Sequence, residues 1–223
     1  MKFDYPELSA VPFKGRRFYE TPANKFYPSI TTILGGTVSK EKEASLKKWQ
    51  MSLGMDAAQK KTQEAADRGT AVHLLAERHL KKEDLFQGQK FNAADVSMFN
   101  GLKLKLNKIT EVWGQEVALF SDMIEVAGRC DVIGVYKDKP SIIDFKTSTR
   151  LKSDSMIEDY KLQLCAYAIM HNEMFGTDID TGVILMSSEG GFPQEFIIHL
   201  PDFVGTLVDR VDLFYEKLNA EVL

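Results

Sequence analysis

The stretch Ser141-Ile142-Ile143-Asp144-Phe145-Lys146-Thr147-Ser148 places a carboxylate and an amine two residues apart at the end of an apolar strand. Side chains alternate between the two faces of a strand, so Asp144 and Lys146 are expected on one face and Ile143 and Phe145 on the other. A charged pair that leaves a buried strand is costly unless it has a partner or a chemical task. This pair has the chemistry needed to bind a divalent metal through Asp144 and to position a water molecule with Lys146.

Periodicity around this stretch predicts a mixed α/β chain in which an antiparallel meander leads into a crossover. Helices are expected over residues 41–53, 56–80, 92–108, 155–170 and 201–218. Strands are expected over residues 16–20, 115–120, 128–136, 141–146, 181–186 and 195–199. Gly69 weakens the second helix, and residues 135–140 suggest a tight turn. The first 40 residues are otherwise expected to be irregular, because they contain four prolines and a Gly-Gly pair.

Composition limits the class of protein. The chain has 223 residues, of which 44% are hydrophobic and 27% charged, as in a globular domain with a substantial core. No apolar run reaches the length of a membrane span, and the first residues resemble neither a secretory signal nor a transit peptide. Cys130 and Cys165 lack CxxC spacing, which argues against a zinc or iron–sulfur site and predicts a reducing, cytoplasmic setting.

Charge is divided unevenly along the chain. The net charge is −4, but residues 1–110 hold 19 Lys and Arg against 12 Asp and Glu, whereas residues 111–223 hold 9 against 20. The basic part could guide a polyanion, while the acidic part contains the candidate metal ligands. Solvated helix faces would give the same distribution. We therefore expect one domain over residues 1–223, with a largely helical, basic, DNA-guiding part (1–110) and a sheet core that carries the metal site (111–223).

Two further carboxylates lie on the strands that precede Asp144. Asp131, in Gly128-Arg129-Cys130-Asp131, is expected on the neighbouring strand, and adjacent strands are about 4.8 Å apart, so both carboxylates could share one hard cation. Alone, Asp131 would more often be a turn or edge-strand acid, but beside Asp144 and Lys146 a metal ligand is favoured. Glu116, one strand earlier, suits a second cation or a salt bridge equally well.

Polar residues on two predicted helices complete the candidate site. His73 is not followed by Glu and a second His, so it does not form a zincin motif, and a lone His among Val and Leu is more often a core residue. Glu77 lies one turn further on the same helix face and could orient His73. Gln163 and Tyr167 are also one turn apart, and they could face the site or form a polar–aromatic pair at a helix boundary.

Together and in this order, these residues resemble the PD-(D/E)xK nuclease superfamily, and its RecB-like exonuclease branch in particular. The matching positions are His73, Glu116, Gly128-x-x-Asp131, Asp144-x-Lys146 and Gln163-x-x-x-Tyr167. The segments Tyr27-Pro28-Ser29-Ile30-Thr31-Thr32-Ile33-Leu34 and Ala66-Asp67-Arg68-Gly69-Thr70, together with Trp49, look like exonucleases of the mitochondrial genome maintenance type and their phage relatives. The resemblance covers about residues 27–170.

The resemblance implies a restriction-endonuclease-like core, with a mixed central sheet in the order αβββαβ, and an N-terminal helical elaboration. It implies a metal site formed by His73, Asp131, Asp144 and the main-chain carbonyl of Phe145. Lys146 would position or activate the attacking water, Glu116 would assist, and Gln163 with Tyr167 would brace the site and the DNA strand. A nearby metal cation and partial desolvation are expected to lower the pKa of Lys146.

The resemblance also implies which residues touch the substrate. Residues expected to contact DNA, several of them at phosphates, are Arg68, Ser29, Thr31, Thr147 and Ser148. One or two Mg²⁺ or Mn²⁺ ions would be the cofactors. Asp144 stands where many relatives have Glu, which shortens its reach by one methylene. The four cluster cysteines of some branches are missing, so no iron–sulfur cluster is expected.

The predicted function is metal-dependent hydrolysis of DNA by an exonuclease that prefers single-stranded DNA or free ends. The expected setting is DNA recombination, repair or processing in the cytoplasm of a bacterial or phage-infected cell, because no mitochondrial presequence is recognised. Recombination or replication proteins are possible partners, and a membrane is not expected.

Three alternatives stay open. The same chemistry suits a structure-specific or restriction-type endonuclease. The chain could instead be a non-catalytic DNA-binding module, or an interaction protein whose Asp144–Lys146 pair is only a strand-end salt bridge. Phe26, Tyr27 and Trp49, near the basic part, could stack on bases as in single-strand binders, although core packing is favoured for Trp49.

Overall fold

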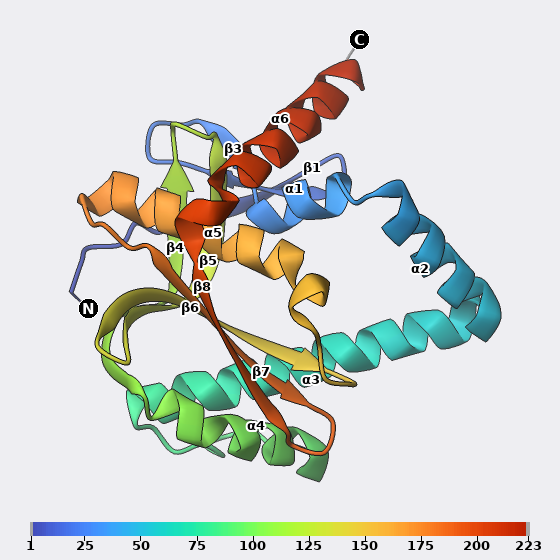
Figure 1. Ribbon diagram of the computed structural model, residues 1–223, viewed down its shortest axis with the longest axis vertical. Coiled ribbons are helices and arrows are strands. Elements are labelled where there is room, and N and C mark those ends of the chain that lie inside the picture. The colour runs from blue at the N-terminus through green and yellow to red at the C-terminus, as the bar shows by residue number, and fades with distance from the viewer. Residues whose placement is uncertain (1, 222–223) are drawn as a thin grey trace.

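A five-stranded mixed sheet in the order β4-β5-β6-β7-β8 forms the centre of the molecule (Figure 1). The structure is a computed structural model and describes residues 2–221. The strands are β4 (Ile109–Ser121), β5 (Val126–Tyr136), β6 (Lys139–Ser148), β7 (Thr181–Ser188) and β8 (Pro193–His199). The pair β6 and β7 is parallel, and the other neighbouring pairs are antiparallel.

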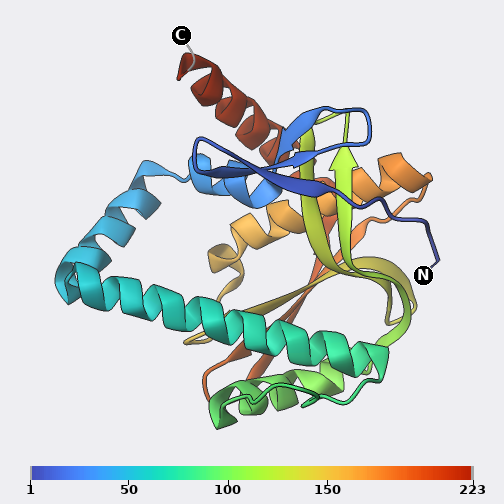
Figure 2. The same ribbon diagram turned by 180° about the vertical axis from the view of Figure 1, so that it is seen from behind.

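Helices cover both faces of this sheet. One face carries α1 (Ile30–Gly36), α5 (Glu158–Phe175) and α6 (Val204–Ala220), and the other carries α3 (Met55–Lys81) and α4 (Ala93–Leu106). In both views α2 (Lys40–Leu53) stands beside the sheet and links α1 in one layer to α3 in the other (Figures 1 and 2). Short 3₁₀ turns, Asp154–Met156 and Leu200–Phe203, lead into α5 and α6.

Each face of the sheet has its own hydrophobic core, and β6 contributes to both. Ile142 packs in the core under α5, whereas Ile143 and Phe145 pack in the core under α3 and α4. The alternation predicted for this strand is therefore confirmed. Because Asp144 and Lys146 share the face of Ile142, their side chains lie on the α5 side, where the Lys146 ammonium is 5.0 Å from the ring centre of Tyr160.

The predicted fold class is confirmed. Helices, three strands, a helix, two strands and a final helix follow one another as expected, and they form the mixed sheet of a restriction-endonuclease-like core. The hairpin between β5 and β6 turns at Lys137 and Asp138, whose φ values of 47° and 65° are those of a type I′ turn. Asn92 caps α4 by accepting the Asp95 N–H at 2.8 Å. Gly69 does not interrupt α3.

The expectation that the first 40 residues are irregular is wrong apart from residues 16–20. They form a three-stranded antiparallel sheet of β1 (Ser9–Phe13), β2 (Arg16–Glu20) and β3 (Phe26–Pro28), followed by α1. The prolines are compatible with strands here, because Pro12 lies on an edge strand and Pro28 ends β3. Strands this short show little alternation of apolar and polar residues, so the prolines and glycines led to the prediction of irregular structure.

The expected core position of Trp49 is also wrong. No side chain of α2 is buried, and Leu46 and Trp49 are 54% and 37% exposed. The helix packs mainly against α3, rather than onto the sheet, so its apolar side has no core to join. An amphipathic pattern predicts the helix but not what covers its apolar side.

Strand β4 is longer than predicted. Its register with β5 shifts between Ile109 and Glu111 and again between Val112 and Gly114. Each irregularity breaks the period-two alternation, so the regular pattern becomes visible only from Gln115 onwards. Within residues 2–221, no helix is long and apolar enough to cross a membrane.

Acid is expected to destabilise the protein through His171 of α5. This side chain is fully buried, its Nδ1 lies 2.7 Å from Thr177 Oγ1, and its Nε2 lies 3.2 Å from Tyr5 Oη. Burial lowers the pKa of His171 to about 4, whereas an unfolded histidine has a pKa of about 6.5. The folded state therefore keeps its full stability above pH 6.5 and loses about 2 kcal/mol from this group as pH falls to 4.5.

Urea unfolding of His171→Gln at pH 7 and pH 4.5 tests this expectation. The variant should lose less stability between the two pH values than the wild type does. The matched control is His199→Gln, because His199 is exposed and its replacement reports the effect of losing a surface histidine. Equal pH dependence in the wild type and His171→Gln would rule out the assignment.

Candidate active site

Strands β5 and β6 separate where the candidate residues lie. Their pairing runs from the hairpin to Val132 and Ile143 and stops there. Beyond that pair, the Phe145 N–H donates to Asp131 Oδ2 at 2.9 Å, so a side chain replaces the missing main-chain acceptor. This bond holds the Asp131 carboxylate in the gap between the strands, next to the residue that follows Asp144.

His73 reaches the same gap from α3. Its Nδ1 lies 3.4 Å from Asp131 Oδ2, and its Nε2 lies 2.7 Å from the Phe145 carbonyl oxygen. The side chain is half-buried and faces polar groups, so it is not a core histidine. Glu77 does not orient it, because the Glu77 carboxylate pairs with Lys81 at 2.6 Å.

The Asp144–Lys146 pair is formed within one strand. Lys146 Nζ donates to Asp144 Oδ1 at 2.7 Å, and Asp144 is only 2% exposed. Burial raises the pKa of Asp144, and repulsion from Asp131 adds to this effect while Lys146 opposes it. The other carboxylate oxygen, Oδ2, lies 2.5 Å from the same ammonium, so Lys146 contacts both oxygens of Asp144.

The charges around Lys146 act against the predicted fall in its pKa. Burial lowers the pKa of Lys146, but the carboxylates of Asp144 and Asp131 outweigh burial, so the pKa lies above its usual value. The prediction relied on repulsion from a metal cation, and the protein groups alone have the opposite effect. Lys146 is therefore an ammonium that can donate hydrogen bonds.

Glu116 lies on β4 directly across from Asp131. Its neighbours Gln115 and Val117 pair with Val132 and Cys130, which places Glu116 opposite Asp131 in the register. Its φ of 52° is unusual for a non-glycine residue within a strand, and such strain concentrates at functional sites. Burial, followed by repulsion from Asp131, raises the pKa of Glu116 to about 6.

Three side chains form a compact set of potential metal ligands. Each of His73, Glu116 and Asp131 offers one donor atom, and these three atoms lie within 4.8 Å of one another. Asp144 is outside this compact set, and the Phe145 carbonyl already contacts His73. Two carboxylates and an imidazole are donors that fit a divalent cation such as Mg²⁺ or Mn²⁺. The sequence left Glu116 undecided, and the structure groups it with the other ligands.

Gln163 and Tyr167 form a buried pair on the α5 face of the sheet. Gln163 Nε2 donates to Tyr167 Oη at 3.1 Å. The Tyr167 ring lies against Gly128 of β5, where an added Cβ would be only 2.8 Å from Tyr167 Cε1. Gly128 therefore lets α5 approach the strand that carries Asp131, which explains the glycine in this motif.

Two of the side chains predicted to contact DNA form hydrogen bonds with nearby main-chain groups instead. The Ser29 hydroxyl caps α1 by accepting the Thr32 N–H at 3.0 Å, and Ser29 is buried. The Ser148 hydroxyl donates to the Arg150 carbonyl at 2.7 Å and is also buried. Thr31 is exposed, with its hydroxyl 3.0 Å from that of Ser29.

The other two predicted DNA contacts lie near the end of β6. Thr147 is half-buried beside α3, where a Cβ on Gly69 would be 3.8 Å from its hydroxyl oxygen. Arg68, one residue earlier on α3, donates from Nη1 to Glu189 Oε1 at 2.9 Å. Thr147 and Arg68 therefore lie on the α3 side of the sheet, near the end of β6.

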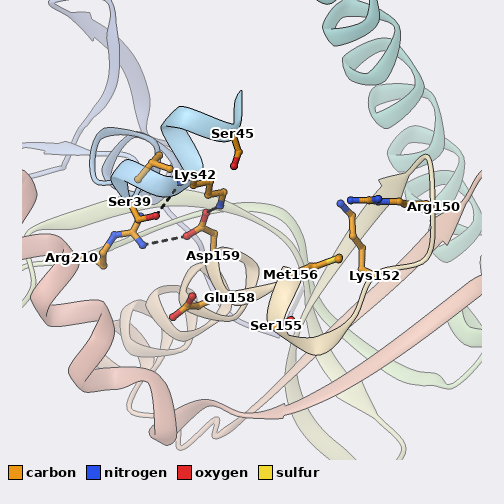
Figure 3. Close-up of a pocket in the computed structure, with 11 residues that line it drawn as sticks. Ser39, Lys42, Ser45, Arg150, Lys152, Ser155, Met156, Glu158, Asp159 and Arg210 are labelled. Carbon is orange, nitrogen blue, oxygen red and sulfur yellow. Dashed lines mark hydrogen bonds and ion pairs between the residues drawn. The ribbon is translucent and has the colours of Figure 1, made fainter. Parts of the chain in front are cut away.

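A cavity of about 490 Å³ lies between the start of α2, the loop after β6, and α6 (Figure 3). On one wall Lys42 and Arg210 both pair with Asp159, and Arg210 Nη1 is 3.3 Å from Asp159 Oδ1. On the other wall Arg150 and Lys152 extend toward each other, and within residues 2–221 neither side chain has an ion-pair partner. No sequence motif predicts this cavity, because the residues that line it come from three separate segments.

Comparisons with known proteins show what the chain is similar to. Residues 43–189 match the sequence model of the PD-(D/E)XK nuclease superfamily. Mitochondrial genome maintenance exonuclease 1 of Xenopus tropicalis is 27% identical over an alignment of 206 residues, which covers 86% of this chain and 55% of the relative. The protein of that name from Homo sapiens is 24% identical over an alignment of 173 residues, which covers 74% of this chain and 50% of the relative.

The chain spans about half the length of the curated relatives it matches. A crystal structure of a candidate exonuclease from Eubacterium rectale aligns with a TM-score of 0.49 and 12% identity, over 70% of this chain and 69% of that one.

Proposed function

The chain belongs to the PD-(D/E)XK nuclease superfamily, and we propose from this premise that it is a metal-dependent DNA exonuclease. The observation that carries the proposal is the position of the Asp144–Lys146 pair, which lies at the strand separation beside the compact set of His73, Glu116 and Asp131. Relatives named as genome maintenance exonucleases support DNA as the substrate and exonuclease action as the reaction.

The proposed chemistry is hydrolysis of a phosphodiester bond. Asp131, Glu116, His73 and Asp144 would hold one or two divalent ions, Mg²⁺ or Mn²⁺, and such an ion supplies Lewis-acid stabilisation of the charge that develops on phosphorus-bound oxygens. Lys146, an ammonium held by Asp144, donates a hydrogen bond that orients the attacking water. Gln163 and Tyr167 keep β5 and α5 in place behind the site.

The proposed substrate is single-stranded DNA or a free DNA end, guided by basic side chains of residues 1–110 and the loop after β6. Arg150 and Lys152 support this part of the proposal, because two cations that face each other suit a phosphate between them. Thr147, Thr31 and Arg68 would contact the same strand.

The proposed setting is DNA recombination, repair or processing in a bacterial or phage-infected cell, where replication or recombination proteins would be partners. Two free cysteines suit its reducing cytoplasm.

Digestion of labelled DNA tests the proposal. Linear single-stranded DNA, labelled at either end, should be degraded with Mg²⁺ or Mn²⁺ and left intact with EDTA, and blocking each end in turn reports the direction of digestion. Circular single-stranded DNA should resist, because an exonuclease needs an end. Cutting of the circle would identify an endonuclease instead. Binding without any cutting would indicate a non-catalytic DNA-binding module.

A further inference from the structure

An aromatic side chain stands exposed in a groove close to the site. The groove, of about 690 Å³, lies between α2, α3 and the ends of β6 and β7. Its lining includes Leu46, Trp49, Lys61, Arg68, Thr149 and Glu189. We call it the Trp49 groove. Trp49 is 37% exposed although a tryptophan is strongly favoured in a core, so its ring is available to a partner.

The Trp49 groove adjoins the active site along two elements. Arg68 and His73 are five residues apart on α3, which at 1.5 Å per residue is about 8 Å along the helix. Thr149 follows β6 directly and is three residues beyond Lys146, about 10 Å at the rise of a strand. A DNA strand whose phosphate lies at Asp144 and Lys146 therefore passes the groove within a few nucleotides.

The charges of the Trp49 groove balance. Lys61 and Arg68 are offset by Glu64 and Glu189, and Arg68 is already paired with Glu189. Such a groove has little attraction for a phosphate backbone, which is bound by uncompensated cations. A flat aromatic ring beside aliphatic Leu46 instead suits the face of a planar, weakly polar ring. The Arg68 Nε, buried and without a hydrogen bond among the described residues, adds a donor beside it.

We propose that Trp49 stacks on a nucleobase of an unpaired DNA strand that enters or leaves the active site. The proposal rests on the proposed function and adds a specificity to it. In a duplex, neighbouring bases cover both faces of every base except at the terminal pairs, so only an unpaired strand can offer base faces to Trp49 along its length. Stacking on an exposed aromatic side chain is independent of sequence, because every base has such a face. The groove therefore selects single-stranded DNA without reading its sequence.

Tryptophan fluorescence measures this contact directly. The chain has two tryptophans, and Trp113 is only 7% exposed, so the accessible signal comes from Trp49. Metal-free protein in EDTA should be titrated with a single-stranded oligonucleotide and with the matching blunt duplex. The single strand should quench the fluorescence and the duplex should quench it much less. Trp49→Phe should abolish the change in tryptophan signal, which assigns it to this residue.

Two substitutions separate stacking from packing. Trp49→Leu keeps an apolar side chain without a ring and should weaken single-strand binding roughly 5- to 150-fold, the range for one stacked base. Trp49→Phe keeps a ring and should stay within about threefold of the wild type. The matched control is Met51→Leu, because Met51 is on the same helix, is 80% exposed and does not line the groove. The loss in Trp49→Leu should be similar at 50 and 200 mM salt, because stacking releases no counterions.

An abasic nucleotide moved along the oligonucleotide locates the contact. At one or two positions it should weaken binding by the wild type and have no further effect on Trp49→Leu. Equal binding by the wild type and Trp49→Leu, or the absence of quenching by a bound single strand, would overturn the proposal. Digestion of DNA by the same wild-type protein would then leave the nuclease function standing. Failure of the wild type both to bind and to digest DNA would overturn the two proposals together.

Discussion

Asp144→Asn and Lys146→Met are each expected to reduce DNA hydrolysis by roughly 10³-fold or more. Removing a group that positions water or carries charge in the transition state typically has effects of this size. Asp144→Asn removes the negative charge while keeping the shape of a side chain that is 2% exposed. Lys146→Met removes the ammonium that donates to Asp144 at 2.7 Å and keeps an unbranched chain in its place. The rate on end-labelled single-stranded DNA with Mg²⁺ measures both effects.

Loss of activity must be separated from loss of fold, because each substitution leaves a buried charge without its partner. Breaking a buried ion pair commonly costs a few kcal/mol of folding stability. Thermal unfolding followed by circular dichroism should therefore show a lower midpoint but an intact cooperative transition. Lys139→Met on the exposed end of the same strand is the matched control and should retain full activity. Two folded, fully active variants would show that the Asp144–Lys146 pair is only a strand-end salt bridge.

The sequence predicts β6 well because the apolar residues of this strand follow a period of two. Ile142, Ile143 and Phe145 alternate between two cores, and this alternation alone fixes the face of Asp144 and Lys146. The sequence does not predict the separation of β5 and β6 beyond Val132. There Asp131 accepts a main-chain N–H from the neighbouring strand, and no local sequence pattern reports such a contact.

The set of potential metal ligands shows the same limit. His73 stands in an apolar helical pattern that resembles core packing, and only the approach of α3 to the gap between the strands brings it to Asp131. Glu116 has a backbone conformation with positive φ that sequence statistics would not assign to glutamate in a strand. Both residues acquire their roles from tertiary contacts. The resemblance to a nuclease family supplied what local patterns could not, because it links residues far apart in the chain.

Trp49 and the cavity with Arg150 and Lys152 illustrate a third limit. An apolar residue at helical spacing predicts a buried face, yet α2 packs mainly against α3 and leaves Trp49 exposed. The two cations are close in the sequence, but their relation to Lys42 and Arg210 across the cavity depends on three elements meeting. Both surfaces depend on how separate elements pack together, which local sequence patterns do not report.

Asp131→Asn is expected to reduce the affinity for Mn²⁺ at least 10- to 100-fold, and DNA hydrolysis with it. Substitutions of groups that merely orient metal ligands already have effects of about this size. Asp131 has two tasks that the substitution separates. The asparagine oxygen can still accept the Phe145 N–H, so the gap between the strands should persist. The substitution removes the negative charge of Asp131, which lies beside Glu116 and His73. The site therefore loses part of its attraction for a divalent cation.

Isothermal titration calorimetry with Mn²⁺ in the absence of DNA measures the affinity independently of catalysis. The matched control is Asp209→Asn, because Asp209 lies on α6, is exposed and is outside the compact ligand set. It should bind Mn²⁺ as the wild type does, whereas Asp131→Asn should show weak or undetectable heats. If Asp131→Asn binds Mn²⁺ normally but fails to cut DNA, the carboxylate acts on the substrate rather than on the metal. If it binds and cuts normally, the metal lies elsewhere, and Asp131 serves only to hold β6 apart from β5.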